Sequence, residues 1–330
     1  MTLLSDLISP LSPRLCAPQV RKYTRPPMAQ AEGPWTVERL LGWMRGYFER
    51  RNIDSPRLSA ELLLAHVLKV PRIKLYTDYQ STLGEEQLAT LRDLVTRAGN
   101  EEPIAYLTGR AHFFNLEFIV TPAVLIPRPD TETLVEQAMR IFRDTLGFES
   151  PRVLDLCTGS GCIAIAIAKH KAGAQVVAVD ISDAALSVAE QNVEKNAVGE
   201  QVMLMRGDLY EPLDGLPDPS PFDVIVSNPP YIAKSQLAGL PKNVKDYEPM
   251  LALDGGDDGL DFHRRILAGA DRWLRPGGYV LLEIAFDQEE SALALLADKP
   301  EWTGGRILRD YAGQPRVLMG QRAEKKEEEF

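Results

Sequence analysis

The sequence predicts an α/β protein with a doubly wound, mostly parallel seven-stranded sheet, preceded by a small N-terminal helical-bundle domain. Three observations lead to this fold class. From Pro151 onward, segments with strand patterns alternate with segments of helical periodicity, which is typical of a doubly wound parallel sheet. Residues 34–109 carry helical periodicity without a strand signal. Glycine-rich and proline-rich turns directly follow the first and the fourth expected strand, where open α/β sheets hold their ligands.

The composition is that of a globular protein, and it limits the classes of function. The chain has 330 residues, of which 45% are hydrophobic and 25% are charged, which is material for about two domains. A formal net charge of −10 disfavours a protein that holds long nucleic acid by releasing counterions, so we do not expect nucleic acid as a direct substrate. No apolar run approaches the roughly 20 residues of a membrane span, so we expect no membrane partner.

The cysteines indicate a reducing compartment. Cys16, Cys157 and Cys162 are too few for a disulfide framework, and they are not spaced as a zinc site. We therefore expect a cytoplasmic protein that binds no metal.

Two terminal segments are expected to lie outside the folded domains. Residues 1–33 are rich in proline and in basic side chains, so we interpret them as a disordered extension or as the product of an upstream start, with Met28 as a plausible true beginning. A transit peptide is the alternative, and it would make the location organellar. Residues 323–330 are expected to form a charged, solvated tail.

Residues 34–109 are expected to form a bundle of short helices. From Trp35 to Glu49, apolar side chains recur at three- and four-residue steps. Asp54-Ser55-Pro56 is a good helix start, because cap-forming residues precede a proline at the first helical position. A further apolar face runs from Glu85 to Ala98. Short helices joined by short loops predict a separate domain.

Residues 110–124 are expected to link this domain to the sheet as a β-hairpin. The stretch from Phe113 to Thr121 alternates and is rich in β-branched side chains, which favours a hairpin or an edge strand. Two prolines then hold Leu125–Glu132 in an extended loop. We expect Asp130 or Thr131 to cap the helix that follows.

The sheet is expected within residues 125–322. Five segments in chain order are predicted to be strands, and helical patterns separate them. Two further short strands near the end are expected to form an antiparallel pair at the sheet edge. We interpret Arg275–Gly278 as the turn that precedes the fifth strand. The seven expected strands are Arg152–Leu156, Gln175–Asp180, Val202–Arg206, Phe222–Ser227, Tyr279–Ile284, Arg306–Arg309 and Arg316–Gln321.

The first strand runs into a glycine-rich turn, Cys157-Thr158-Gly159-Ser160-Gly161, which opens a helix. Its glycines allow a ligand to approach the backbone closely. Asp180 ends the next strand, where a carboxylate can accept hydrogen bonds from the hydroxyls of a ribose. The spacing also fits a dinucleotide fingerprint, so a nicotinamide enzyme is one alternative. Asp155 is placed to meet a cationic amino-acid group, through water or the loop backbone, and no second cluster suits hydride transfer, so a different nucleoside cofactor is favoured.

Asn228-Pro229-Pro230-Tyr231 follows the fourth strand. Proline lacks an N–H group and fixes φ, so the backbone must turn stiffly here. Asn228 offers an amide, Pro229 a free carbonyl and Tyr231 a flat face, which together suit a planar NH2 group. The fourth strand of a doubly wound sheet lies beside the first, so this motif and Asp208 are expected to meet whatever the glycine turn holds. A plain proline turn without a site is the alternative.

These motifs together resemble a known superfamily. Asp155–Gly161, the strand that ends at Asp180, and Ser227–Ile232 are similar to class I S-adenosylmethionine-dependent methyltransferases that modify NH2 groups on planar nitrogen. Within that superfamily, Leu125–Glu132 and Tyr247–Ile266 resemble the HemK-type peptide chain release factor glutamine methyltransferases, which are protein-(glutamine-N5) methyltransferases.

The resemblance extends from about Trp35 to Gln321, with two visible departures. Cys157 and Ala285 stand where many relatives have glycine. The loop from Tyr247 to Gly259 allows two interpretations: it folds over the acceptor or receives a basic partner, or it only precedes a helix, with Asp258 near the cap.

The resemblance implies methyl transfer from S-adenosylmethionine to the side-chain amide nitrogen of a glutamine in a peptide chain release factor. Residues 34–109 would help to dock that protein, and residues 125–322 would form the methyltransferase domain. The implied catalytic residues are Asn228, Pro229, Pro230 and Tyr231. The implied cofactor-binding residues are Asp155, Cys157, Thr158, Gly159, Ser160, Gly161, Asp180, Asp208, Leu209 and Asn228.

Three other functions stay open from the sequence. They are glutamine methylation of a ribosomal protein, adenine N6-methylation of DNA or RNA, and cofactor binding without turnover. The acidic balance and the lack of a basic target-reading domain disfavour the nucleic-acid enzyme.

Overall fold

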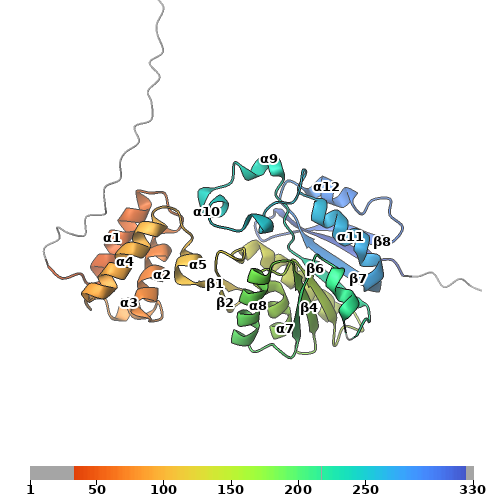
Figure 1. Cartoon of the computed structure of the whole chain (residues 1–330), viewed down its shortest axis with the longest axis horizontal. Coiled ribbons are helices and arrows are strands. Elements are labelled where there is room, and N and C mark those ends of the chain that lie inside the picture. The colour runs from red at the N-terminus through yellow and green to blue at the C-terminus, as the bar shows by residue number, and fades with distance from the viewer. Residues whose placement is uncertain (1–32, 217, 325–330) are drawn as a thin grey trace, which may run out of the picture.

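The computed structural model describes residues 33–216 and 218–324, in which a helical region lies beside an α/β region (Figure 1). The predictions for residues 1–32, including Cys16 and Met28, and for the last six residues of the tail lie outside the described residues. No described helix is long and apolar enough to cross a membrane. The assignment of a docking domain to 34–109 and of a methyltransferase domain to 125–322 stays a prediction.

The helical region packs around one apolar cluster. Thr36 caps its first helix, accepting a hydrogen bond from the Arg39 N–H at 3.3 Å, and Pro56 begins the second. Leu40, Met44 and Phe48 meet Leu63, Leu64 and Leu91 in a fully buried core, where each side chain contributes about 1.5–3 kcal/mol by leaving water. The helices are α1 (Val37–Glu49), α2 (Pro56–Leu68), α3 (Lys74–Thr77), α4 (Glu85–Ala98) and α5 (Ile104–Thr108).

A β-hairpin joins the two regions. Strands β1 (Arg110–Phe113) and β2 (Leu116–Ile119) pair antiparallel, and the turn residues between them have positive φ, as a tight hairpin requires. The fully buried Asn192 exchanges hydrogen bonds with the backbone of Ile119, accepting at 2.6 Å and donating at 3.0 Å. It also donates to the Ser160 carbonyl at 2.9 Å. The hairpin is thereby fastened to the glycine turn.

The sheet has seven strands in the order β5-β4-β3-β6-β7-β9-β8, and only the pairs of β9 with β7 and β8 are antiparallel. This confirms the predicted doubly wound sheet and places the first and fourth expected strands, β3 and β6, side by side. The strands are β3 (Arg152–Leu156), β4 (Gln175–Asp180), β5 (Val202–Arg206), β6 (Phe222–Ser227), β7 (Leu274–Glu283), β8 (Trp302–Arg309) and β9 (Pro315–Arg322).

Two strand starts were predicted too late. Strand β8 begins at Trp302 and not at Arg306, because a register shift between Thr303 and Arg306 lets Gly304 and Gly305 lie within the strand. Strand β7 begins at Leu274, so Arg275–Gly278 lies within it and is not a turn before it. Leu274 pairs with Phe222, and Tyr279 pairs with Val224. A register shift between these two pairs accommodates the extra residues of β7. Gly277, with φ of +73°, supplies the irregular backbone that such a bulge needs.

Helices cover both faces of the sheet, because successive strand residues point to opposite sides. Val153, Val224 and Leu281 face one cluster, while Leu154 and Ile225 face the other. The first cluster is closed by α6 (Glu132–Asp144), α7 (Cys162–His170) and α8 (Asp183–Lys195), and the second by α11 (Asp261–Trp273) and α12 (Glu289–Ala294). This arrangement leaves the carboxyl ends of β3, β4 and β6 at one open edge.

Candidate active site

The turn after β3 is built from residues in the left-handed region of backbone space. Gly159 has φ of +54° and Gly161 of +78°, and a Cβ on Gly161 would lie 3.1 Å from Ile165 Cδ1 and 3.3 Å from Ala189 Cβ. Cys157 has φ of +60°, which costs a side chain about 1–2 kcal/mol relative to glycine. The departure from glycine noted in the sequence therefore falls on a position whose backbone favours glycine.

Asp180 ties this turn to the end of β4. Its Oδ2 accepts a hydrogen bond from the Gly159 N–H at 2.8 Å, and its Oδ1 accepts one from the Ser182 N–H at 2.9 Å. Burial raises the pKa of the Asp180 carboxyl, and the two backbone donors oppose that shift. The carboxylate also lies on the wall of the cavity, where each oxygen has a further lone pair for a hydroxyl donor.

Asp155 lies behind the turn and not in the cavity wall. It is fully buried, and its Oδ2 accepts hydrogen bonds from the Thr158 hydroxyl at 2.6 Å and from the Ala164 N–H at 3.2 Å. Its Oδ1 has no hydrogen-bond partner among the described residues, and burial raises the pKa of the carboxyl to about 7. The structure thus makes Asp155 a support of the turn and of the start of α7, so any contact with a cofactor would pass through the loop.

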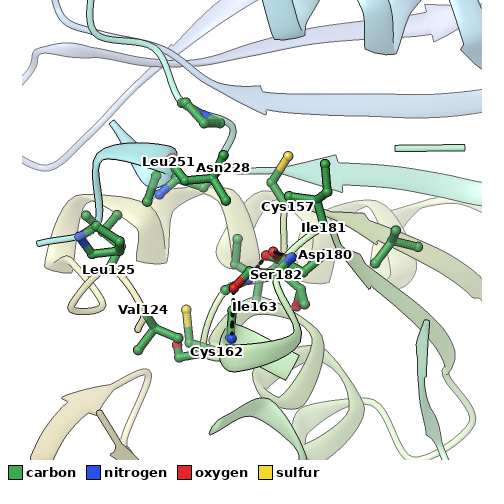
Figure 2. Close-up of a pocket in the computed structure, with 18 of the residues that line it drawn as sticks. Val124, Leu125, Cys157, Cys162, Ile163, Asp180, Ile181, Ser182, Asn228 and Leu251 are labelled. Carbon is green, nitrogen blue, oxygen red and sulfur yellow. Dashed lines mark hydrogen bonds between the residues drawn. The ribbon is translucent and has the colours of Figure 1, made fainter. Parts of the chain in front are cut away.

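A cavity opens at the carboxyl ends of β3, β4 and β6 (Figure 2). It holds about 1120 Å³, including its mouth to solvent, which is ample for a nucleoside ligand. Its wall is formed mainly by the glycine turn, the end of β4, the turn after β5, the acceptor motif and the loops at residues 123–131 and 249–252. The sequence-predicted residues on the wall are Cys157, Thr158, Gly159, Ser160, Asp180, Asp208, Leu209, Asn228 and Pro230.

Asp208 and Leu209 reach this wall in different ways. The Asp208 carboxylate accepts a charge-assisted hydrogen bond from Arg265 Nη2 at 2.7 Å. Leu209 is buried with φ of +53° and offers an apolar surface beside the exposed Ile181. The prediction that Asp208 meets the ligand of the glycine turn stays untested, and Ile181 and Leu209 supply apolar walls at this corner.

Asn228 and Pro230 face the cavity, whereas Gly161, Pro229 and Tyr231 do not line it. Asn228 Nδ2 donates to Thr131 Oγ1 at 3.2 Å. The Tyr231 hydroxyl is turned away to Glu283 Oε1, at 3.2 Å. The prediction that Tyr231 stacks on a planar amide stays untested.

The loop before α6 belongs to the same wall, although the cap predicted there is wrong. Thr131 has φ of −64° and ψ of −20° and makes no capping bond, because a short 3-10 helix, Pro129–Thr131, already runs into α6. A cap needs a non-helical backbone at that residue. The Thr131 hydroxyl is used for Asn228, and Asp130 pairs instead with Arg316, at 2.9 Å.

The two motifs at Leu125–Glu132 and Tyr247–Ile266 meet across the cavity mouth. Arg128 Nη2 lies 2.6 Å and 2.7 Å from the two carboxylate oxygens of Glu248. The Glu248 side chain is only 1% exposed, and the neighbouring Arg128 opposes the rise in its carboxyl pKa that burial causes. A buried carboxylate is costly without such a partner, so this pair fixes the relative position of the two loops.

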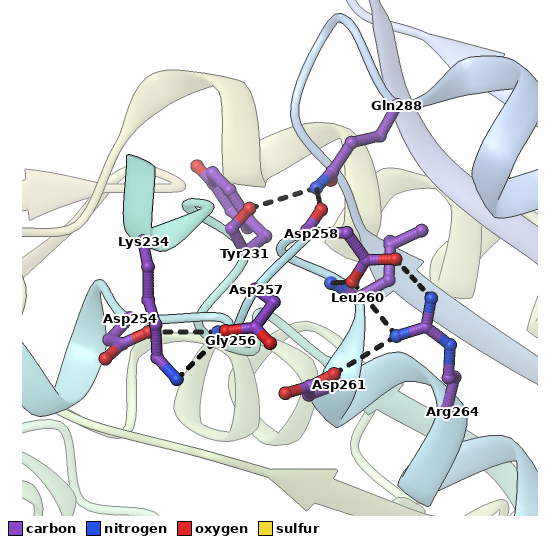
Figure 3. Close-up of polar contacts among 10 residues, drawn as sticks. All are labelled: Tyr231, Lys234, Asp254, Gly256, Asp257, Asp258, Leu260, Asp261, Arg264 and Gln288. Carbon is purple, nitrogen blue, oxygen red and sulfur yellow. Dashed lines mark hydrogen bonds and ion pairs between the residues drawn. The ribbon is translucent and has the colours of Figure 1, made fainter. Parts of the chain in front are cut away.

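Residues 253–259, here called the strap, are fastened to the acceptor motif (Figure 3). The backbone of Ile232 donates to Leu253 at 3.0 Å and accepts from Gly255 at 2.9 Å. Gln288 Nε2 donates to the Tyr231 carbonyl at 3.0 Å and to the Asp258 carbonyl at 3.4 Å. Asp258 also accepts from the Leu260 N–H, next to the start of α11, as the second interpretation of this loop expects. That the loop folds over the acceptor or receives a basic partner stays a prediction.

Sequence reasoning missed three residues around the acceptor motif. They are Glu283, Gln288 and Thr131, the last as the partner of Asn228. Glu283 is 1% exposed at the end of β7. A charged residue in the otherwise apolar run Leu281-Leu282-Glu283-Ile284 was the available signal, since a buried charge is rare without a specific role. Nothing in the sequence around Gln288 separates it from an ordinary surface glutamine.

The strand order, the glycine turn with its acidic partner and the acceptor motif at the switch point are those of a class I S-adenosylmethionine-dependent methyltransferase. Two family models match the chain, one described as the PrmC N-terminal domain over residues 39–109, the other as the methyltransferase small domain over residues 131–241. The chain belongs to the family of release factor glutamine methyltransferases, because relatives of that name are 43% and 46% identical to it, over 80% and 84% of its length.

Relatives with that name are similar over most of their length. A release factor glutamine methyltransferase from Geobacter sulfurreducens is 43% identical, over 80% of this chain and 89% of the relative. One from Gloeobacter violaceus is 46% identical, over 84% of this chain and 95% of the relative. A solved protein-(glutamine-N5) methyltransferase (release factor-specific) from Alicyclobacillus acidocaldarius is 33% identical, over 62% of this chain and 99% of that chain, with a TM-score of 0.37.

The residues of the cavity fit S-adenosylmethionine, which supplies a sulfonium methyl group when bound. The Asp180 carboxylate is available to ribose hydroxyls, and the apolar corner at Ile181 and Leu209 suits an adenine. No cluster of His, Cys, Asp or Glu within residues 33–216 and 218–324 could hold a metal ion.

Replacing Asp180 by alanine is expected to weaken the binding of this cofactor about tenfold or more, because charge-assisted hydrogen bonds to ribose would be lost together with the support of Gly159. Calorimetric titration with S-adenosylhomocysteine measures this. Asp183→Ala is the matched control, since Asp183 is exposed at the start of α8 and pairs with Arg206. Equal affinities of Asp180→Ala and wild type would contradict the assignment.

Proposed function

We propose that this protein transfers the methyl group of S-adenosylmethionine to the side-chain amide nitrogen of a glutamine in a peptide chain release factor. The observation that carries most weight is the place of Asn228, which stands on the wall of the same cavity as Gly159 and Asp180. A group held by Asn228 therefore faces the cofactor site directly. The names of the relatives support the glutamine of a release factor as the acceptor.

The acceptor motif has the chemistry that this reaction needs. A glutamine amide nitrogen is a poor nucleophile, because its lone pair is delocalised into the carbonyl. Asn228 Oδ1 and the Pro229 carbonyl would accept its two N–H groups, which orients the nitrogen and favours the positive charge that develops on it. The amide proton can leave to solvent afterwards, so these residues need no dedicated general base.

The helical region is the proposed docking domain for the release factor. It reaches the site through two hydrogen bonds: the Tyr106 hydroxyl donates to the Val124 carbonyl at 2.7 Å, and the Tyr247 hydroxyl donates to the Asn100 carbonyl at 3.3 Å. Both contacts adjoin loops that border the cavity, so a protein bound to α1–α5 would lie close to its mouth. The proposed place of action is the cytoplasm, where such a substrate works.

The decisive experiment is labelled methyl transfer to release factor, ribosomal protein and DNA side by side, with Asn228→Ala as the inactive control. We expect label only on the release factor, and mass spectrometry should place it on a glutamine side chain. Labelling of ribosomal protein alone would move the acceptor to that class. Labelling of DNA alone would overturn the proposed function.

A further inference from the structure

The side-chain amide of Asn228 has an oxygen that accepts hydrogen bonds and a nitrogen that donates them. The proposed function, on which this inference rests, can use only the oxygen. An acceptor NH2 group donates hydrogen bonds, so it must meet Asn228 Oδ1 and not Nδ2. In the structure Nδ2 points the other way and donates to Thr131 Oγ1 at 3.2 Å. Thr131 is 2% exposed and belongs to the short 3-10 helix before α6, far from Asn228 in sequence.

A hydroxyl can either accept from Asn228 or donate to it, and in the structure Thr131 Oγ1 accepts. The Glu283 carboxyl is a neighbour of this hydroxyl, which opposes the rise in the carboxyl pKa that burial causes. Glu283 Oε1 receives the Tyr231 hydroxyl at 3.2 Å, while the buried Oε2 has no hydrogen-bond partner among the described residues. An ionised carboxylate only accepts.

Burial raises the pKa of the Glu283 carboxyl to about 7, so the carboxyl is ionised only above that pH. Arg316 opposes this rise in the pKa, and the guanidinium itself is held by Asp130 at 2.9 Å and by Asp310 at 3.2 Å. His263 lies on the far side of the strand, with Nε2 at 2.7 Å from the Glu283 backbone carbonyl. Above a pH of about 7, the carboxylate favours a Thr131 hydrogen that points towards it, which leaves an oxygen lone pair for Asn228.

We propose that Thr131 is a positioning residue, whose buried hydroxyl accepts from Asn228 Nδ2 and so holds the Asn228 amide with Oδ1 towards the methyl acceptor. The hydrogen bonds then run in one direction, from the acceptor's NH2 group to Asn228 Oδ1, and from Asn228 Nδ2 to Thr131. This direction makes the site selective for groups that donate hydrogen bonds.

A double-mutant cycle tests whether Thr131 acts through Asn228. Thr131→Val removes the hydroxyl at nearly constant volume, whereas Thr131→Ser keeps it. We expect Thr131→Val to lower kcat about tenfold, with an unchanged KM for S-adenosylmethionine, and Thr131→Ser to stay within about twofold of wild type. In an Asn228→Ala background, Thr131→Val should have no further effect, since no amide remains to be oriented. The same reduction in both backgrounds would overturn the proposal.

A second measurement needs no methyl acceptor. In protein labelled with 15N-asparagine, the side-chain NH2 resonances of Asn228 are identified by their loss in Asn228→Ala. They should move in Thr131→Val and stay nearly fixed in Thr131→Ser, and Thr131→Ala serves as a second hydroxyl-free variant if the valine protein does not fold. Unmoved resonances without the hydroxyl would refute the positioning role. Failure of the proposed function would show separately, as wild-type protein that does not label a release factor.

Discussion

Asn228→Ala is expected to lower the rate of methyl transfer about a hundredfold, while the affinity for S-adenosylhomocysteine stays nearly unchanged. The loss follows from the chemistry of the acceptor, whose amide nitrogen must be oriented, and its developing charge stabilised, before it can attack. Asn228 makes a single side-chain hydrogen bond within the described residues, to Thr131, so alanine should cost little stability. Single-turnover transfer of labelled methyl and calorimetric titration of S-adenosylhomocysteine measure the two effects.

Gln191→Ala is the matched control for this substitution. Gln191 also carries a side-chain amide, but it is exposed on α8, and among the described residues it donates only to the Ser187 carbonyl, at 3.0 Å. We expect wild-type turnover for Gln191→Ala. Unchanged turnover of Asn228→Ala would remove Asn228 from the acceptor site. A parallel loss of affinity for S-adenosylhomocysteine would assign it to the cofactor instead.

The sheet could be predicted from the sequence because its signals are local. Buried parallel strands are short apolar runs bounded by turn residues, and the order of strands follows from the chain reversal beside the first strand. The adjacency of β3 and β6 confirms that step and places Asn228 next to the glycine turn. The boundary of β7 was missed because a bulge lets a proline- and glycine-containing stretch continue a strand, which no local pattern distinguishes from a turn.

The supports of the site could not be predicted, because they join distant parts of the chain. Thr131 and Asn228 are 97 residues apart, and Tyr231 and Glu283 are 52 apart. From the local pattern, a threonine before a helix predicts a cap, and only the tertiary structure shows that its hydroxyl serves Asn228. In the same way, Asp155 follows a ligand-binding pattern but faces the buried side of the turn. Sequence places residues at an edge of the sheet, and packing decides which of them face the cavity.

Gly259→Ala is expected to lower methyl transfer at least tenfold, because its new Cβ would press on the acceptor motif from behind. Built on this backbone, the Cβ would lie 2.3 Å from the Tyr231 carbonyl oxygen and 2.5 Å from Gln288 Nε2. The side chain of Gln288 can move, but the Tyr231 carbonyl belongs to the main chain that follows Pro229 and Pro230. Relief of the contact must therefore shift the strap, the motif or both, and a misplacement of about 1 Å can cost on the order of a hundredfold in rate.

Gly313→Ala separates this effect from simple backbone strain. Gly313 also has φ of +79°, yet a Cβ there would meet nothing within 4 Å. Both alanines carry the cost of a left-handed backbone, about 1–2 kcal/mol, so both proteins should melt at lower temperature. Only Gly259→Ala should also lose kcat when both are assayed well below their melting temperatures. If both variants kept wild-type kcat, the strap would only be the loop that precedes α11. Its hydrogen bonds to the acceptor motif would then have no part in holding Asn228 in place.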